Sequence, residues 1–211
     1  MKPAGWFDQQ YFDGAGKSNY SAYTETTANF AAYADAVQAL LARHHLPARG
    51  PVLDVGCAKA YLVAELRRRG VEAYGVDVSE YALACAPTSV RPFLRHASAL
   101  DLGLINLMEY PPLTDPAALD RFSRGKYALA VSFDVFEHFT EDAARRAFRE
   151  LRRVSDYQLV QVNTGWHPAV AFDGDESHVL KLPLAEWRRL AAEEGCTHTT
   201  IVETGRGEVG A

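Results

Sequence analysis

The stretch Pro51–Tyr81, PVLDVGCAKAYLVAELRRRGVEAYGVDVSEY, decides the fold of this chain. It begins with a short apolar run over residues 52–55, which predicts a buried strand. Gly56 ends this strand, and apolar residues at helical spacing follow until Gly70, where a left-handed helix cap is expected. A second short apolar run then ends at Asp77. A strand, a helix and a second strand in this order form a βαβ unit, which predicts an α/β fold with a parallel sheet.

The turn and the two acids of this unit indicate a nucleoside cofactor. Ligands of open α/β sheets bind beyond the carboxyl ends of the strands, and Asp77 follows Gly56 by about 20 residues, the spacing of an acid that accepts ribose hydroxyl groups. A dinucleotide needs glycines close to its diphosphate, but the turn has Ala58 and Ala60. Asp54, at the end of the first strand, offers a carboxylate to an ammonium group. The pattern therefore favours S-adenosylmethionine, which carries an ammonium group and no phosphate.

With these residues the sequence resembles the class I S-adenosylmethionine-dependent methyltransferases, over about residues 51–195. Their first motif is an acid followed by G-x-G-x-G, from which this chain departs by its two alanines. Residues 97–102, ASALDL, are similar to the family's adenine motif G-D-A-x-x-L, with Ser98 in place of the acid. Ser98 can still bond to adenine, or Asp101 substitutes for the missing charge. Residues 133–139, FDVFEHF, are similar to the fourth motif, which faces the methionine and methyl groups.

The resemblance implies a Rossmann-like three-layer αβα sandwich with a mostly parallel sheet, in which the family's seventh, antiparallel strand is not legible here. An uncovered sheet edge makes pairing into a homo-oligomer possible. We expect Cys57, in the cofactor turn, to be a small packing residue rather than a nucleophile. The residues that the resemblance implies for cofactor binding are Asp54, Gly56, Cys57, Ala58, Asp77, Val78, Ser98, Ala99, Phe133 and Tyr20.

Composition sets broad limits on the kind of protein. With 211 residues, 48% of them hydrophobic, the chain can bury one core, so one domain is expected, with a lid segment and helix over 1–48 and the cofactor core over 49–211. The net charge of −5 argues against nucleic acid as a partner. Three cysteines without C-x-x-C spacing indicate a reducing cytoplasm. No run approaches about 18 apolar residues, so we expect no membrane partner.

The rest of the chain supplies covers, helices and strands. Residues 1–27 are rich in aromatic side chains and predict either a cover over the cofactor mouth or an arm on the sheet edge. An amphipathic helix is expected from Phe30 to about His44. Further strands are expected at 92–95, 127–133, 158–162 and 198–202, helices after Ser79, Thr140 and Pro183 with a cap at Gly195, and loops at 104–126 and 163–175.

Among the histidines, His178 is the preferred candidate for the catalytic base. It stands in DESHV just before a predicted helix, and the resemblance places this segment beside the acceptor, with Asp175 near enough to orient the ring. A histidine titrates near pH ~6.5, which suits proton removal at neutral pH. His138 and His167 are further candidates, of which His138 is expected mainly to line the cofactor site. The alternative is that His178 only closes the site or caps the helix.

The leading functional hypothesis is methyl transfer from S-adenosylmethionine to an oxygen or nitrogen atom of a small molecule, in secondary metabolism. A second hypothesis, motivated by Ala58, Ala60 and Ser98, is a cofactor-binding protein without transfer activity. A third is metal-assisted methylation of RNA ribose, because Asp134, Glu137 and His138 have a spacing that can place them on one helix face. The acidic composition argues against it, and no metal ligand is predicted, although whether these residues and His178 bind a divalent ion stays open.

Overall fold

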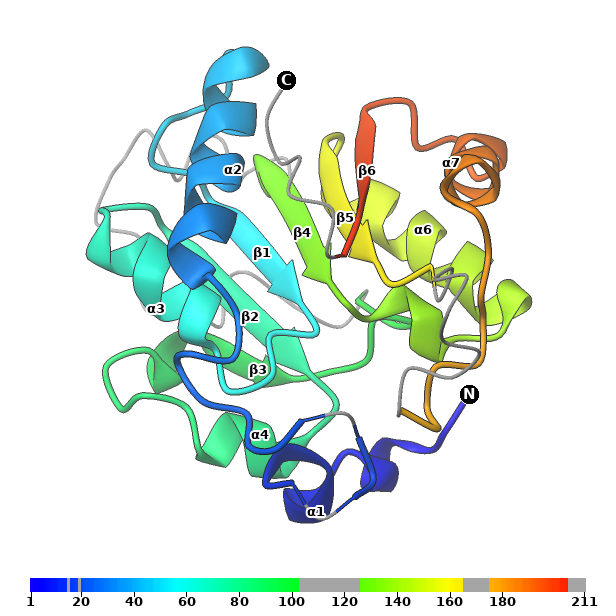
Figure 1. The fold of residues 1–211 in the computed structure, drawn as a ribbon. Coiled ribbons are helices and arrows are strands. Elements are labelled where there is room, and N and C mark those ends of the chain that lie inside the picture. Colours follow the sequence, from blue (N-terminus) through cyan, green and yellow to red (C-terminus); the bar gives the residue numbers. More distant parts are fainter. Residues whose placement is uncertain (15, 19, 103–125, 165–174, 205–211) are drawn as a thin grey trace.

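A six-stranded sheet forms the centre of the molecule (Figure 1). The computed structural model describes residues 1–211 except 15, 19, 103–125, 165–174 and 205–211. The strand order is β3-β2-β1-β4-β5-β6, and every neighbouring pair is parallel. The order reverses between β1 and β4, which is where open parallel sheets bind ligands. The strands are β1 (Val52–Val55), β2 (Ala73–Asp77), β3 (Leu94–His96), β4 (Leu129–Phe133), β5 (Gln158–Val162) and β6 (Thr199–Glu203).

Helices cover both faces of the sheet (Figure 1). Side chains alternate along β1: Leu53 and Val55 belong to a core shared with α6 (Glu141–Val154) and α7 (Leu184–Glu193), whereas Val52 belongs to a core shared with α2 (Phe30–Arg43) and α3 (Tyr61–Arg68). The predicted three-layer αβα sandwich is therefore confirmed. Two short helices, α1 (Gln9–Phe12) and α4 (Glu80–Ala84), lie near the carboxyl ends of the strands.

The helix boundaries follow the local sequence. The side chains of Ser79 and Thr140 accept hydrogen bonds from the backbone N–H groups of Ala82 and Ala143, so both act as the predicted N-caps. The amphipathic helix is α2, which begins after Asn29 and ends at Arg43, as expected.

Two strand boundaries differ from the prediction. The third strand does not include Pro92, which lies in the 3₁₀ helix Arg91–Phe93, and β3 begins at Leu94. A proline has no N–H for a strand ladder, whereas its fixed φ suits the start of a helical turn. The fourth strand begins at Leu129 instead of Tyr127, which forms only an isolated parallel bridge with Ser155.

The N-terminal segment packs on the turn that follows β1. Tyr11 and Phe12 are buried in a cluster with Ala58 and Ala82. In Figure 1 this segment, in dark blue, crosses below the carboxyl ends of the strands. This is the position that a cover of the cofactor mouth requires, and its action as a lid remains a prediction.

Polar bonds fasten the same segment to the turn and to α4. Asp13 accepts hydrogen bonds from the Lys59 ammonium, at 3.0 Å, and from the Tyr81 hydroxyl, at 2.6 Å. The hydroxyl of Ser79 donates to the backbone carbonyl of Phe7 at 2.5 Å. Three elements distant in the sequence are thereby held around the carboxyl ends of β1 and β2.

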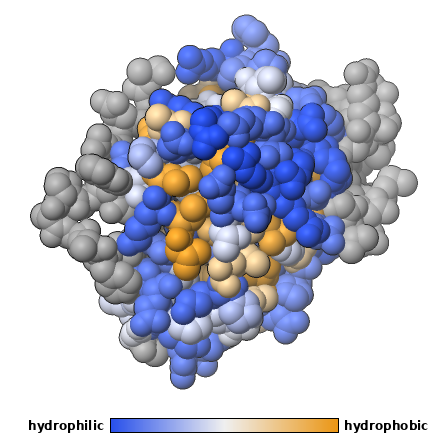
Figure 2. Space-filling view, turned by 90° about the vertical axis from the view of Figure 1, so that its right-hand side faces the viewer, coloured by the Kyte–Doolittle hydropathy of each residue, from blue (hydrophilic) through white to orange (hydrophobic). Residues whose placement is uncertain are grey.

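The surface is mainly hydrophilic on the side shown in Figure 2. Charged pairs join α6 to α7 and the residue after it, for example Arg145 to Glu193 at 2.9 Å and Arg149 to Glu194 at 2.7 Å.

Within the described residues, no helix has the length and apolar character needed to cross a bilayer. Pairing through the sheet edge at β6 remains a prediction, and the described part of the chain contains no seventh strand.

We predict that Gly56→Ala destabilises the fold, whereas Ala60→Gly does not. Gly56 has φ +83°, and an added Cβ would lie 2.3 Å from a methyl carbon of Val135, so the cost should be ~1–3 kcal/mol. Ala60 already has a left-handed φ of 58°, and glycine there should change the free energy of unfolding by less than ~1 kcal/mol. Urea unfolding of both variants measures this. Equal stability of Gly56→Ala and wild type would show that the turn is described wrongly.

Candidate functional site

The site begins at the turn between β1 and α3. The backbone N–H groups of Gly56 and Cys57 donate to the carbonyl of Val76, at 2.8 and 3.0 Å. The Asp77 carboxylate accepts the N–H of Ala58 at 2.8 Å with one oxygen and that of Ser79 at 2.7 Å with the other. Asp77, predicted to bind a ribose, therefore also fixes the turn after β1 and the start of α4.

Two buried carboxyl groups lie at the ends of β1 and β2. Burial, and secondly the neighbouring Asp77 carboxylate, raise the pKa of Asp54 to about 8. Burial also raises the pKa of Asp77, while the hydrogen bonds from Ser79 and Ala58 lower it. At neutral pH Asp54 is therefore mostly protonated, and a cation bound beside it would release its proton.

Three cavities surround this turn, and Gly56 lines all of them. One, of about 200 Å³, is lined by Asp77, Val78, Ser98 and Ala99. We call it the Asp77 cavity. The second, of about 270 Å³, is lined by Asp54, Cys57, Tyr20 and Phe133 and is called the Asp54 cavity. A smaller one between them, of about 90 Å³, includes Ala58. All ten residues predicted to bind the cofactor thus line this group of cavities.

The structure adds residues that the sequence did not assign to the site. Met1, Lys2, Pro3, Ala4 and Phe7 line the Asp77 cavity. Tyr23, Phe30 and Tyr33 line the Asp54 cavity. The many aromatic residues in the first part of the chain indicated that this part covers something, but they did not predict which cavity each ring would line.

Two finer expectations have clear outcomes. Asp101 is exposed and lines none of the three cavities, so it does not replace the missing acid at Ser98. Cys57 packs closely against Gly75, where an added Cβ would lie 2.7 Å from its sulfur. Burial, with Asp77 and Asp54 nearby, raises the pKa of the Cys57 thiol well above its usual value. A protonated, enclosed thiol has a packing role, as predicted.

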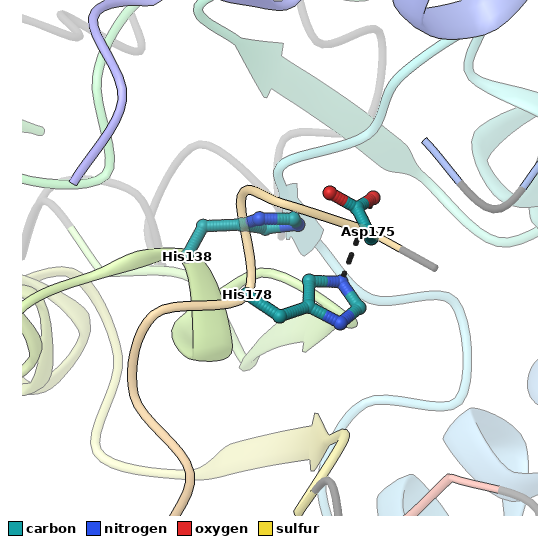
Figure 3. Close-up of side chains that lie close together, drawn as sticks. All are labelled: His138, Asp175 and His178. Atoms are coloured by element: carbon teal, nitrogen blue, oxygen red, sulfur yellow. Dashed lines mark ion pairs between the residues drawn. The ribbon is translucent and has the colours of Figure 1, made fainter. Parts of the chain in front are cut away.

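The candidate bases His138 and His178 lie together with Asp175 (Figure 3). His138 ends the 3₁₀ helix Phe136–His138 after β4, and the other two precede α7. The ring centroids of the histidines are 4.7 Å apart, and Nε2 of His178 is 3.8 Å from Oδ2 of Asp175. This distance is too long for a hydrogen bond, and the contact becomes an ion pair only when His178 carries a proton. His178 lines the Asp54 cavity and His138 lines the Asp77 cavity. His167 lies outside the described residues.

Hydrogen bonds determine which nitrogen of His138 carries the proton. The carboxylate of Asp175 accepts the backbone N–H and the hydroxyl of Ser177 with Oδ1, and the hydroxyl of Tyr11 with Oδ2. The single hydroxyl proton of Ser177 is thus used, so its 2.9 Å contact with Nδ1 of His138 requires Nδ1 to donate. Burial, and next His178, lower the pKa of His138 to about 4. The ring is therefore neutral, with its lone pair on Nε2.

The proposed grouping of Asp134, Glu137 and His138 on one helix face is wrong. Asp134 lies before the 3₁₀ helix with φ 54°, and its carboxylate accepts hydrogen bonds from Gln161 and Thr204. The residues that join His138 are instead Asp175 and His178, whose possible ligand atoms all lie within 4.8 Å of one another. The absence of a metal remains a prediction.

Comparison with known proteins identifies the family. Residues 25–198 match the family model described as a methyltransferase domain, so the chain belongs to this family. A search of curated proteins finds no relative that matches the chain.

Solved structures share the fold. A putative methyltransferase from an antibiotic biosynthesis pathway of Anabaena variabilis is 18% identical, with a TM-score of 0.58 over 81% of this chain and 63% of that one. An S-adenosylmethionine-dependent methyltransferase from Archaeoglobus fulgidus is 15% identical, with a TM-score of 0.53 over 77% and 68%. Magnesium protoporphyrin IX methyltransferase from Synechocystis, with bound S-adenosylmethionine, is 24% identical, with a TM-score of 0.43 over 59% and 54%. The chain spans about half the length of the Synechocystis enzyme and of other solved structures that it matches.

The cofactor is S-adenosylmethionine, as the sequence predicts, because it is the cofactor of the methyltransferase family to which the chain belongs. The residues present fit it. Gly56 lines all three cavities and has room for no side chain, because a Cβ there would lie 2.3 Å from Val135. The buried carboxyl of Asp54, once a cation beside it has released its proton, would pair with the cofactor ammonium. Which residues bind each part of the cofactor remains a prediction.

We predict that Ser177→Ala shifts the tautomer of His138. Loss of the hydroxyl leaves Nδ1 without its acceptor and Asp175 without one donor, which should lower the free energy of unfolding by ~1–3 kcal/mol. Nitrogen-15 NMR should show Nδ1–H in the wild type and a population of Nε2–H in the variant. Ser155→Ala, which removes another fully buried hydroxyl, is the control and should leave the His138 signals unchanged. An Nε2–H signature in the wild type would contradict the assignment.

Proposed function

We propose that the protein transfers the methyl group of S-adenosylmethionine to an oxygen or nitrogen atom of a small-molecule acceptor. The observation that carries this proposal is the arrangement of the Asp54 and Asp77 cavities around one glycine turn. One cavity offers a carboxylate for ribose hydroxyls, and the other offers a carboxylate for an ammonium group. The histidine that the sequence favours as a base lines the second of them.

When bound, the cofactor supplies an electrophilic methyl group on a positively charged sulfur. In the proposal, Asp77 accepts the ribose hydroxyls, Ser98 bonds to the adenine and Asp54 holds the ammonium. Tyr20 and Phe133 line both the Asp54 cavity and the space between the two main cavities, so they would enclose the methyl group. Alignment of an acceptor inside such an enclosed space can supply much of the rate enhancement without covalent help.

We assign to His178 the role of taking up the proton that the acceptor loses. Its ring lines the Asp54 cavity, and Oδ2 of Asp175 lies 3.8 Å from its Nε2, close enough to stabilise the imidazolium that proton uptake would form. His138 stays neutral and acts as the second catalytic candidate through its Nε2. The bonds of Tyr11 and Ser177 to Asp175 would keep this carboxylate in place during the transfer.

The biological setting is also proposed. A role in small-molecule biosynthesis is supported by the fold shared with the Anabaena protein, a putative methyltransferase from an antibiotic biosynthesis pathway. A cytoplasmic location is supported by Cys57, Cys85 and Cys196, none of which forms a disulfide within the described residues. The acidic net charge continues to favour a small-molecule partner over nucleic acid.

We predict that His178→Ala lowers kcat by ~10²–10⁴ while the affinity for S-adenosylhomocysteine stays within a few-fold. Transfer of a tritiated methyl group to a panel of hydroxyl and amine acceptors measures turnover, and calorimetry measures affinity. His198→Ala removes an exposed histidine outside the three cavities and serves as the control. An unchanged kcat would remove His178 from the mechanism. Tight cofactor binding with no turnover on any acceptor would instead favour a cofactor-binding protein without transfer activity.

A further inference from the structure

The wall of the Asp54 cavity indicates the chemical class of the acceptor, an inference that rests on the proposed function. Aromatic and acidic side chains dominate this wall. Among the described residues that line it there is no lysine or arginine. The aromatic residues are Tyr20, Tyr23, Phe30, Tyr33 and Phe133, and the acidic residues are Asp54, Asp134 and Glu137.

The aromatic rings form a connected set. Tyr33 and Phe133 are stacked, with centroids 4.5 Å apart and an interplanar angle of 11°. Tyr20 and Tyr23 meet edge to face at 5.1 Å, and Tyr23 meets Phe30 at 6.3 Å. The faces of such rings attract a cation, and desolvation strengthens this attraction. They repel an anion for the same reason.

Asp134 places a carboxylate among these rings. Its neutral partners are Thr204, which donates to Oδ1, and Gln161, whose amide nitrogen lies 3.4 Å from Oδ1 and 3.2 Å from Oδ2. The same Gln161 nitrogen donates to the hydroxyl of Tyr33 at 3.0 Å. Burial raises the pKa of Asp134, against the hydrogen bonds from Thr204 and Gln161. The site therefore orients a carboxyl group that has no lysine or arginine beside it among the described lining residues, and the charge of His178 in the same wall favours its ionised form.

The cofactor does not balance these acids. S-adenosylmethionine has a net charge of about +1 at neutral pH, because its ammonium and sulfonium outweigh its carboxylate by one, and its ammonium is assigned to Asp54. Asp134 then still faces the same enclosed space. Buried charges are favourable only when they are paired. A cationic group on the acceptor would provide this pairing, whereas an anionic acceptor would increase the imbalance.

We propose that the acceptor is an amine, which enters as an ammonium ion held by Asp134 within the aromatic wall and is methylated on nitrogen. The acceptor nitrogen gives one proton to His178 and forms a bond to the methyl carbon. The bond from that carbon to sulfur breaks, and its electron pair remains on sulfur. The products are S-adenosylhomocysteine and the methylated ammonium ion, so charge and atoms balance.

The test compares matched probes on protein loaded with S-adenosylhomocysteine. Calorimetry at pH 7.5 measures binding of 2-phenylethylamine, a cation, of 2-phenylethanol, its neutral counterpart, and of 3-phenylpropanoate, an anion. We expect the amine to bind at least ~10-fold more tightly than the alcohol, and the anion to bind more weakly than either. Asp134→Asn, which keeps the size of the side chain, should reduce the affinity for the amine by ~10-fold or more and leave that for the alcohol within two-fold. Asp142→Asn, which removes an exposed charge on α6, should change neither.

The outcomes separate this inference from the proposed function. Equal affinity for amine and alcohol, no binding of the amine, or an Asp134→Asn variant that keeps the preference for the amine would each overturn the assignment of an amine acceptor. S-adenosylhomocysteine would still bind in all three cases. Failure of S-adenosylhomocysteine itself to bind would instead contradict the proposed function.

Discussion

The carboxylate of Asp77 is the constraint on which the rest of the site depends. It accepts the N–H of Ala58 with one oxygen and the N–H of Ser79 with the other, and so ties the turn after β1 to the start of α4. The N-terminal segment is fastened to these two elements through Asp13. Because one buried side chain joins the turn, the helix and indirectly the cover, the cavities around Gly56 keep a defined shape.

This arrangement costs stability that the cofactor can offset. Asp54 and Asp77 are both buried, which raises the pKa of each, and the charge of Asp77 raises the pKa of Asp54 further. Ala58 and Ala60 adopt left-handed backbone conformations that suit glycine better. An ammonium ion beside Asp54 would favour its ionised form. Strain and buried charge thus coincide at the proposed cofactor site, as they commonly do at functional sites.

The sequence predicted the parts of the molecule that depend on local patterns. The βαβ unit and the N-caps Ser79 and Thr140 follow from residues close together in the chain, and the structure confirms them. The strand at Pro92 was misplaced because the prediction followed apolar character and ignored the missing N–H.

The contacts around the histidines could not be predicted in the same way. The carboxylate of Asp134 accepts hydrogen bonds from Gln161 of β5 and Thr204 after β6, and no local sequence pattern predicts these partners. The contact of Ser177 with His138, which determines the tautomer of the ring, could not be predicted either, because a serine before a helix is usually interpreted as an N-cap. Long-range bonds of buried polar groups decide such details.

The most direct measurement is the calorimetric affinity of S-adenosylhomocysteine for the wild type and for Asp77→Ala. The account predicts that the variant folds but binds ~10–150-fold more weakly, because the ribose hydroxyls lose a charged acceptor worth ~1.5–3 kcal/mol and the turn loses its anchor. Circular dichroism establishes that the variant is folded. An unchanged affinity in a folded Asp77→Ala protein would show that the cofactor does not bind across the Asp77 and Asp54 cavities.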